Sequence, residues 1–393
     1  GRLLAESMES EGRLDEAVKL HASLVEKRPE SRLDLVRLLI KKNLRLPQPQ
    51  RRWQEVEQRL RESEKATPSA VEDLTRTRAD LLAAQNRFDE ARKLLTTALA
   101  EDPRNLNYRL AVAGIARKEA KPSQAVQVLD QAEKDLGPSL EIQLARLALW
   151  GERGGDEARA AVAKLAESRK HMKPADLPEY LDRLARTAVR LREPVLAGQY
   201  WGELAALQPE NLDVLESLFD LALQNKDLAG ARELVERIRK VEGDGGASWR
   251  FSEAALDLDE DRREPQAPGA SQRLKAAGEL AVSISELRPD WWGGPALKGQ
   301  IAELKGLTDE AVEQFKQAVA RGGLQPAVVN RLMTMLYRKP GDHSGEIEQV
   351  VGDLRSRGYR VEDLAITEAV AAIGKGDAAR GLALARQTVS ESS

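Results

Sequence analysis

A small residue returns along this sequence at a nearly constant interval. The steps from Ala91 to Ala125 and from Ala197 to Ala231 are each 34 residues, and the step from Ala125 to Ala158 is 33 residues. An interval in this range is typical of two-helix units that stack in tandem. In such a fold each unit contacts only its neighbours, so function has to be sought on a surface and no active-site pocket is obligatory.

Proline marks the end of the second helix in several units. Pro103 follows Ala91 by twelve residues, and proline cannot continue a helix. The same offset applied backwards from Pro289 locates a unit at Ala277. Eleven units are then expected, with repeat positions at Ala17, Val56, Ala91, Ala125, Ala158, Ala197, Ala231, Ala277 and Ala311 and two degenerate positions near Gly345 and Gly381.

A second small residue lies twelve positions before the repeat position in several units. These residues are Ala79, Ala113, Ala185 and Gly299. Two antiparallel helices joined by a short turn approach to about 8–10 Å, and a large side chain at the crossing would separate them. The paired small residues therefore predict where the two helices of a unit cross.

This pattern resembles that of the tetratricopeptide repeat family. The residues that carry the resemblance are Gly299, Ala311, Phe315 and Ala318 in one unit and Ala79, Ala91, Leu95, Ala98 and Pro103 in another. The resemblance implies an all-α fold, a right-handed superhelical α-solenoid of about eleven stacked antiparallel helix pairs. It also implies that the first helix of each pair lines a concave face.

We expect one solenoid over residues 1–393. Where the repeat interval exceeds 34 residues, the surplus lies at 46–50, 171–175 and 259–270, which we expect to be softer joints. Terminal repeats usually carry polar caps, and neither end of the sequence looks like one. The chain is therefore expected to be a fragment of a longer repeat protein.

The sequence offers no candidate for catalysis, cofactor binding or small-molecule chemistry. It has no cysteine, and His21, His171 and His343 are its only histidines, each in a different unit. No HExxH, GxSxG or glycine-rich phosphate loop occurs. We expect His21 to be a structural residue of the core with its polar atoms satisfied, and we expect no enzyme activity.

Three aspartates have the spacing with which a calcium loop begins. Asp257, Asp259 and Asp261 fit this start, but Arg262 and Pro268 occupy the positions where the loop needs Gly and Glu. A solvated acidic loop is the favoured interpretation, and no metal site is expected.

Two neighbouring tryptophans, Trp291 and Trp292, have two possible roles: they pack over the edge between repeats, or they anchor a partner. Packing is the favoured interpretation.

The surface most suited to a partner is expected where the first helices turn their side chains into the groove. Counting along the repeat places one set of side chains on one face of a first helix, namely Glu179, Asp182, Arg186 and Arg190. It places a second set on the same face of the next first helix, namely Asp213, Glu216 and Asp220. Residues 203–261 hold 15 acids and 6 bases, so the complement would be a basic segment of another protein. The alternative is an ordinary solvated helix face.

The opposite charge balance occurs near the start of the chain. Residues 27–61 hold 11 bases and 4 acids, which allows an anionic partner, although solvated helix faces are favoured. The net charge of -3 disfavours nucleic-acid binding, including base reading by helical repeats. No apolar run approaches the roughly 20 residues of a membrane span, and the compartment, cytoplasmic or periplasmic, stays open.

These observations favour a non-enzymatic scaffold or adaptor that binds an extended peptide or helix in its concave groove. The alternative is an accessory repeat region of a larger enzyme or of a bacterial envelope or secretion assembly, whose active part lies outside this sequence.

Overall fold

The computed structural model describes residues 8, 13–28, 31–46, 48–341 and 343–359, together with 368–369, 372–373, 378–379 and 381–383. These residues form α-helices and short 3-10 turns, and no strand occurs among them. The chain divides into two compact units, His21–Leu221 and Gly1–Leu20 together with Ala222–Ser393. Helices α2 (Leu14–Lys27) and α13 (Leu212–Gln224) each contain a boundary between the units.

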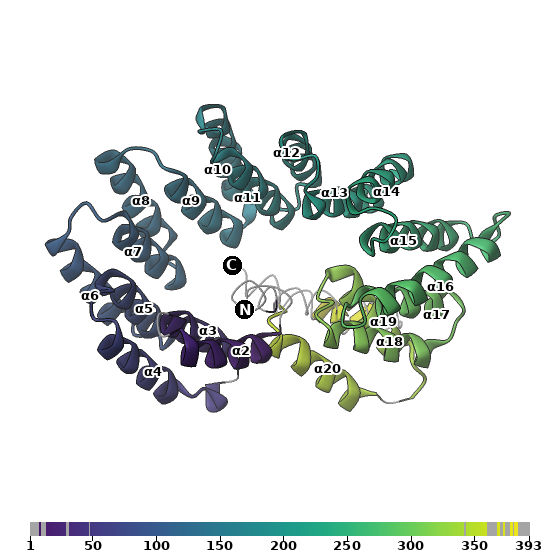
Figure 1. The fold of residues 1–393 in the computed structure, drawn as a ribbon, viewed down its shortest axis with the longest axis horizontal. Coiled ribbons are helices and arrows are strands. Elements are labelled where there is room, and N and C mark those ends of the chain that lie inside the picture. Colours follow the sequence, from purple (N-terminus) through teal and green to yellow (C-terminus); the bar gives the residue numbers. More distant parts are fainter. Residues whose placement is uncertain are drawn as a thin grey trace. The chain divides into compact units, whose positions relative to one another are not determined.

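The unit His21–Leu221 consists of helix pairs in tandem (Figure 1). Its helices are α3 (Arg32–Arg45), α4 (Trp53–Ala66), α5 (Val71–Ala84), α6 (Phe88–Glu101), α7 (Leu106–Lys118), α8 (Pro122–Leu136), α9 (Leu140–Arg153), α10 (Gly155–Glu167), α11 (Leu177–Arg190) and α12 (Pro194–Leu207). The 3-10 turns η2 (Gln48–Gln50) and η3 (Ser168–His171) occupy the longer connections.

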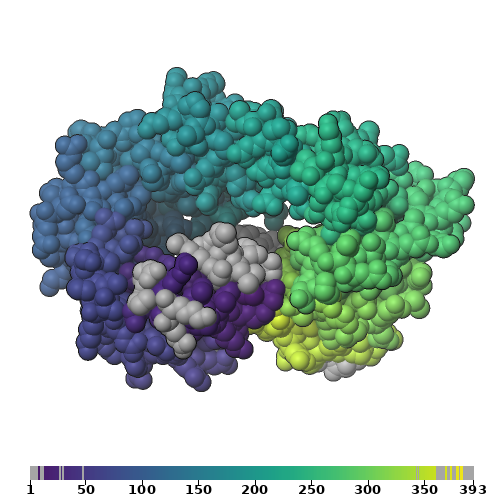
Figure 2. All heavy atoms as spheres, viewed as in Figure 1, coloured from purple at the N-terminus to yellow at the C-terminus, as the bar shows by residue number. Residues whose placement is uncertain are grey.

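The other unit continues the same pattern. Its helices after α13 are α14 (Leu228–Glu242), α15 (Ser248–Arg263), α16 (Ala270–Leu287), α17 (Gly293–Leu304), α18 (Thr308–Ala320), α19 (Pro326–Arg338) and α20 (Ser344–Ser356). In both units the surface colours of Figure 2 change gradually from one repeat to the next, as expected when each repeat packs on its neighbours in sequence. The fold is an α-solenoid of stacked helix pairs, as the sequence predicts.

The repeat positions lie at one structural place. In most pairs the repeat residue is the fourth residue of the second helix, and α16 places Ala277 one turn later because that helix has an additional N-terminal turn. All nine are at most 1% exposed, namely Ala17, Val56, Ala91, Ala125, Ala158, Ala197, Ala231, Ala277 and Ala311. Their small side chains let the two helices of a pair cross closely.

The matching small residues of the first helices are buried at the same crossings. Ala79, Ala113 and Ala185 are core residues. A Cβ added to Gly299 would lie 2.8 Å from the Phe315 ring, so the glycine is required by the large side chain opposite it.

The turn between the two helices of a pair repeats a left-handed residue. Asn86, Ala120, Arg192 and Lys226 have φ between 59° and 63°. Each lies five residues before the repeat alanine of its unit, and Gly306 occupies the same place before Ala311. The turn also repeats a backbone hydrogen bond, such as that from Arg87 N to Leu82 O. This left-handed C-terminal cap ends the first helix and satisfies its last carbonyls.

The first helices form the inner layer of the unit His21–Leu221, and α15 and α17 of the other unit pack on each other in the same way. They contact the first helices of neighbouring pairs, as in α3–α5, α5–α7, α7–α9 and α9–α11 of one unit and α15–α17 of the other. No comparably extensive contact joins successive second helices in the described part of the chain. Because the first helices are packed more closely along the stack, they lie on the inside of its curvature.

Two predicted boundaries are wrong. Residues 259–263 are the last turn of α15, so the connection there is only 264–269. The repeat position of the unit near 345 is Ile347, the fourth residue of α20, because Ile347, Val351 and Leu354 face the core whereas Gly345 is exposed. Gly381 is buried as expected, since a Cβ there would lie 2.9 Å from the carbonyl oxygen of Ala369.

The three spaced aspartates are also not a loop. Asp257, Asp259 and Asp261 lie on α15, where successive alternate residues turn by about 200° and cannot converge on one cation. Among the described residues, no group of three or more acidic or histidine side chains is placed to hold a metal ion.

Trp291 and Trp292 pack against the preceding repeat. Their ring centroids lie 5.4 and 5.0 Å from that of Phe251 on α15, in edge-to-face arrangements that aromatic pairs prefer. The predicted packing over the edge between repeats is therefore observed.

His21 is buried in the core, as predicted. However, its Nδ1 makes no hydrogen bond to any described residue, so the expectation that its polar atoms are satisfied is wrong. No described helix has the length and apolar character needed to cross a membrane.

Candidate functional site

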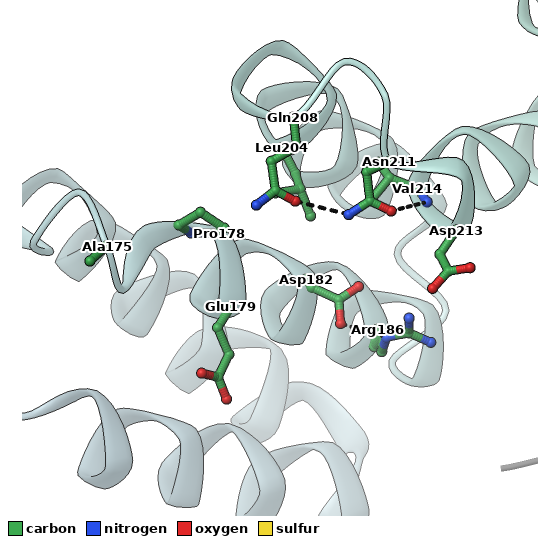
Figure 3. Close-up of a pocket in the computed structure, with 10 residues that line it drawn as sticks. All are labelled: Ala175, Pro178, Glu179, Asp182, Arg186, Leu204, Gln208, Asn211, Asp213 and Val214. Atoms are coloured by element: carbon green, nitrogen blue, oxygen red, sulfur yellow. Dashed lines mark hydrogen bonds and ion pairs between the residues drawn. The ribbon is translucent and has the colours of Figure 1, made fainter. Parts of the chain in front are cut away.

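A cavity of about 390 Å³ opens between α11, α12 and the start of α13, and all of its lining residues belong to the unit His21–Leu221. Figure 3 shows the α11 side chains on one side and the end of α12 with the following loop on the other. The lining residues are Ala175, Pro178, Glu179, Asp182, Arg186, Leu204, Gln208, Asn211, Asp213 and Val214.

The loop side of the cavity is fixed by the cap of α13. Asn211 accepts a hydrogen bond from Val214 N at 3.3 Å, which satisfies a free amide of the first helical turn. Its side-chain amide donates to Gln208 Oε1 at 2.8 Å (Figure 3). The buried side chains of Leu204 and Val214 complete this side with apolar surface.

On the α11 side, Asp182 is held by two donors. Arg186 Nε donates to Asp182 Oδ2 at 2.7 Å, and Trp201 Nε1 donates to Asp182 Oδ1 at 3.2 Å. The ion pair between Asp182 and Arg186 is local, because residues four apart lie on one helix face. These two charges therefore largely cancel.

Two other acids of the cavity have no such partner. The side chains of Glu179 and Asp213 are exposed and form no ion pair with any residue in the described part of the chain. With Asp182 neutralised by Arg186, they leave the lining with an excess of negative charge. The cavity suits a cationic group with an apolar stem.

The structure brings together only part of the predicted groove. Asp182, Arg186 and Asp213 line the cavity, together with Glu179. Arg190 lies at the end of α11, and Glu216 and Asp220 lie further along α13; none of these three lines the cavity.

Sequence reasoning missed the contribution of the second helix and of the loop. Leu204 lies in the last turn of α12 and Gln208 directly follows that helix, whereas the count along the repeat considers first helices alone. The position of Asn211 immediately before an apolar helix was a usable signal, because asparagine is a favoured cap residue. Nothing in the sequence indicated that Trp201 holds Asp182.

Comparisons with known proteins bear mainly on the fold. Residues 82–149, from the end of α5 to α9, match a family model described as tetratricopeptide repeat. No curated protein matches the sequence significantly.

Several solved structures are similar at low identity. The structure of pilF from Pseudomonas aeruginosa has 15% identity and a TM-score of 0.35, covering 57% of this chain and 94% of that one. The structure of yeast Tom70 has 13% identity and a TM-score of 0.38, covering 98% and 90%. The Cut9-Hcn1 hetero-tetramer of the APC/C has 13% identity and a TM-score of 0.40, covering 95% and 68%.

These TM-scores are low, so only the family model bears on the type of repeat. The helix pairs and their buried small residues agree with it. Residues 82–149 of this α-solenoid match the tetratricopeptide repeat model, in agreement with the resemblance that the spacing of the small residues indicates.

Proposed function

We propose that this protein is a non-enzymatic interaction module that binds an extended segment or a helix of another protein along its first helices. A lysine or arginine side chain of the partner enters the cavity between α11, α12 and α13. Tandem helix repeats expose an extended surface of this kind, and partner segments bind to it through side chains at regular spacing.

The observation that carries the proposal is that Glu179 and Asp213, which have no ion-pair partner among the described residues, lie beside apolar and amide groups in one cavity. The volume of about 390 Å³ accommodates a long side chain with part of its backbone. Leu204 and Val214 lie in the wall of the cavity, where the aliphatic stem of a basic residue can contact them while the acids meet its charged end.

A peptide selection tests the proposal even though the partner is unidentified. Random peptides displayed on phage are selected against the full chain, and we expect the selected sequences to share a lysine or arginine at one position. Asp213→Lys should weaken the binding of a selected peptide at least about tenfold, since the variant places a like charge beside the basic residue.

The matched control is Glu101→Lys, which makes the same charge change at an exposed site at the end of α6, outside the cavity. It should leave the affinity within about twofold. Selected peptides without a shared basic residue, or equal affinity for the wild type and Asp213→Lys, would overturn the assignment of this cavity.

A further inference from the structure

One residue of the acidic cavity carries the same charge as the side chain that the cavity is proposed to receive. Arg186 lines the cavity together with Glu179, Asp182 and Asp213. Its guanidinium is bound to Asp182, with Nε 2.7 Å from Oδ2. In the view of Figure 3 this pair lies between Glu179 and Asp213. The cavity therefore already contains a cationic group of the protein's own.

The two members of this pair are held differently. Asp182 also accepts a hydrogen bond from Trp201 Nε1 at 3.2 Å, and Trp201 is a buried residue of α12. Arg186 has 54% of its side chain exposed and is bound through Nε alone, since its terminal nitrogens make no hydrogen bond within the described part of the chain. The carboxylate is thus fixed by a second helix, whereas the guanidinium is attached only to that carboxylate.

The attachment of Arg186 is also weak. Asp182 and Arg186 are four residues apart on one helix, and exposed pairs of this kind contribute little to stability, because water screens the charges and a long side chain loses freedom when it is held. Another cation can therefore replace Arg186 with little loss of stability. The carboxylate that is released then joins those of Glu179 and Asp213 in binding the incoming charge.

We propose that Arg186 is an internal competitor for this cavity: the basic side chain of the partner takes its place on Asp182, and Arg186 turns out into solvent. The inference rests on the function proposed above and specifies how the cavity is regulated. It adds Asp182 to the binding residues, and it gives Arg186 the role of lowering the affinity of the cavity for cations. An ion pair with only a structural role would not limit the affinity in this way.

The test is calorimetric titration of a phage-selected peptide into variants of the full chain. Arg186→Gln should tighten binding about three- to tenfold, since the variant removes both the competitor and its like charge. Arg183→Gln is the matched control, because it removes an exposed arginine from the same helix outside the cavity. This control should change the affinity less than about twofold.

A double-mutant cycle separates competition for Asp182 from simple charge repulsion. Asp182→Asn keeps an oxygen that can accept from Trp201 Nε1 but removes the charge, so it should weaken the peptide several-fold. In this background Arg186→Gln should gain less than about twofold, because no carboxylate remains for which Arg186 competes. An undiminished gain in the Asp182→Asn background would overturn the proposal.

The outcomes distinguish this inference from the function on which it rests. If the peptide carries the basic residue and Asp213→Lys weakens it, but Arg186→Gln tightens it no more than Arg183→Gln does, the competitor role of Arg186 is wrong and the proposed function stands. Selected peptides without a shared basic residue would overturn both.

Discussion

The surroundings of Asp257 disfavour the ionised form of its carboxylate. It lies on α15 and is partly buried, and this burial is the main reason why its pKa rises to about 6. Repulsion from Glu253, Glu260 and Asp261 acts in the same direction, and only the attraction of Arg273 opposes it. The folded protein therefore binds a proton at Asp257 more tightly than the unfolded chain does.

The consequence is a pH-dependent loss of stability that Asp257→Asn should remove. Between the ordinary aspartate pKa of about 3.9 and a folded pKa of about 6, the folded state binds more protons, so stability falls as pH rises through this window. The variant should gain about 1–2 kcal/mol in unfolding free energy at pH 7 and almost nothing at pH 4.

Chemical denaturation at the two pH values measures this difference. Asp259→Asn is the control on the same helix, because Asp259 is paired with Arg263 at 2.6 Å and its neutralisation should bring no gain at pH 7. An equal gain from Asp257→Asn at both pH values would show that relief of charge is not the cause.

At the scale of the helix pair, steric fit decides which small residues are required. Gly299 on α17 and Gly114 on α7 are both inside first helices, but their surroundings differ. A Cβ at Gly299 would meet the buried ring of Phe315 at 2.8 Å, whereas a Cβ at Gly114 would have no atom within 4 Å.

Alanine at these two glycines should therefore have opposite effects. Gly299→Ala is expected to cost about 1–3 kcal/mol because the Phe315 ring must move. Gly114→Ala should gain about 0.5–1 kcal/mol from the better helix propensity of alanine. Thermal unfolding of both variants measures the contrast, and recovery of stability in Gly299→Ala combined with Phe315→Leu would confirm the steric cause. Destabilisation by Gly114→Ala would contradict this account.

At the scale of the whole molecule, stability is distributed over neighbouring pairs. Within each unit, adjacent helix pairs contact one another, and the buried clusters are local; one, for example, joins α17 to α20. In such an array a defect weakens its own repeat and the adjacent interfaces before it affects distant ones.

Hydrogen exchange followed by mass spectrometry can show this locality. Gly299→Ala should speed amide exchange in α17 and α18 and, to a smaller extent, in α16 and α19, with no change in α5 to α8. Acceleration of similar size in every helix would mean that the chain unfolds as one cooperative body.

The sequence by itself determined the helix pairs and their buried small positions. Close crossing of two helices is a local steric requirement, so it leaves a small residue at a fixed place in each unit, as at Ala91 and Ala125. The same local pattern located the cavity-lining face of α11. The sequence pattern wrongly predicted a loop at the end of α15, because the stretch is charged and followed by proline, although the helix continues to Arg263.

The tertiary structure decided which charges have partners. Glu179, Asp182 and Asp213 are equivalent acids in the sequence, but only Asp182 is held by Arg186 and by Trp201 of another helix. The close pair of Glu303 with Arg331 joins residues on different repeats, and Arg262 lies farther from the same carboxylate, at 3.9 Å. Ion pairing depends on distances of a few ångströms between side chains far apart in sequence, and only the packing of neighbouring repeats sets those distances.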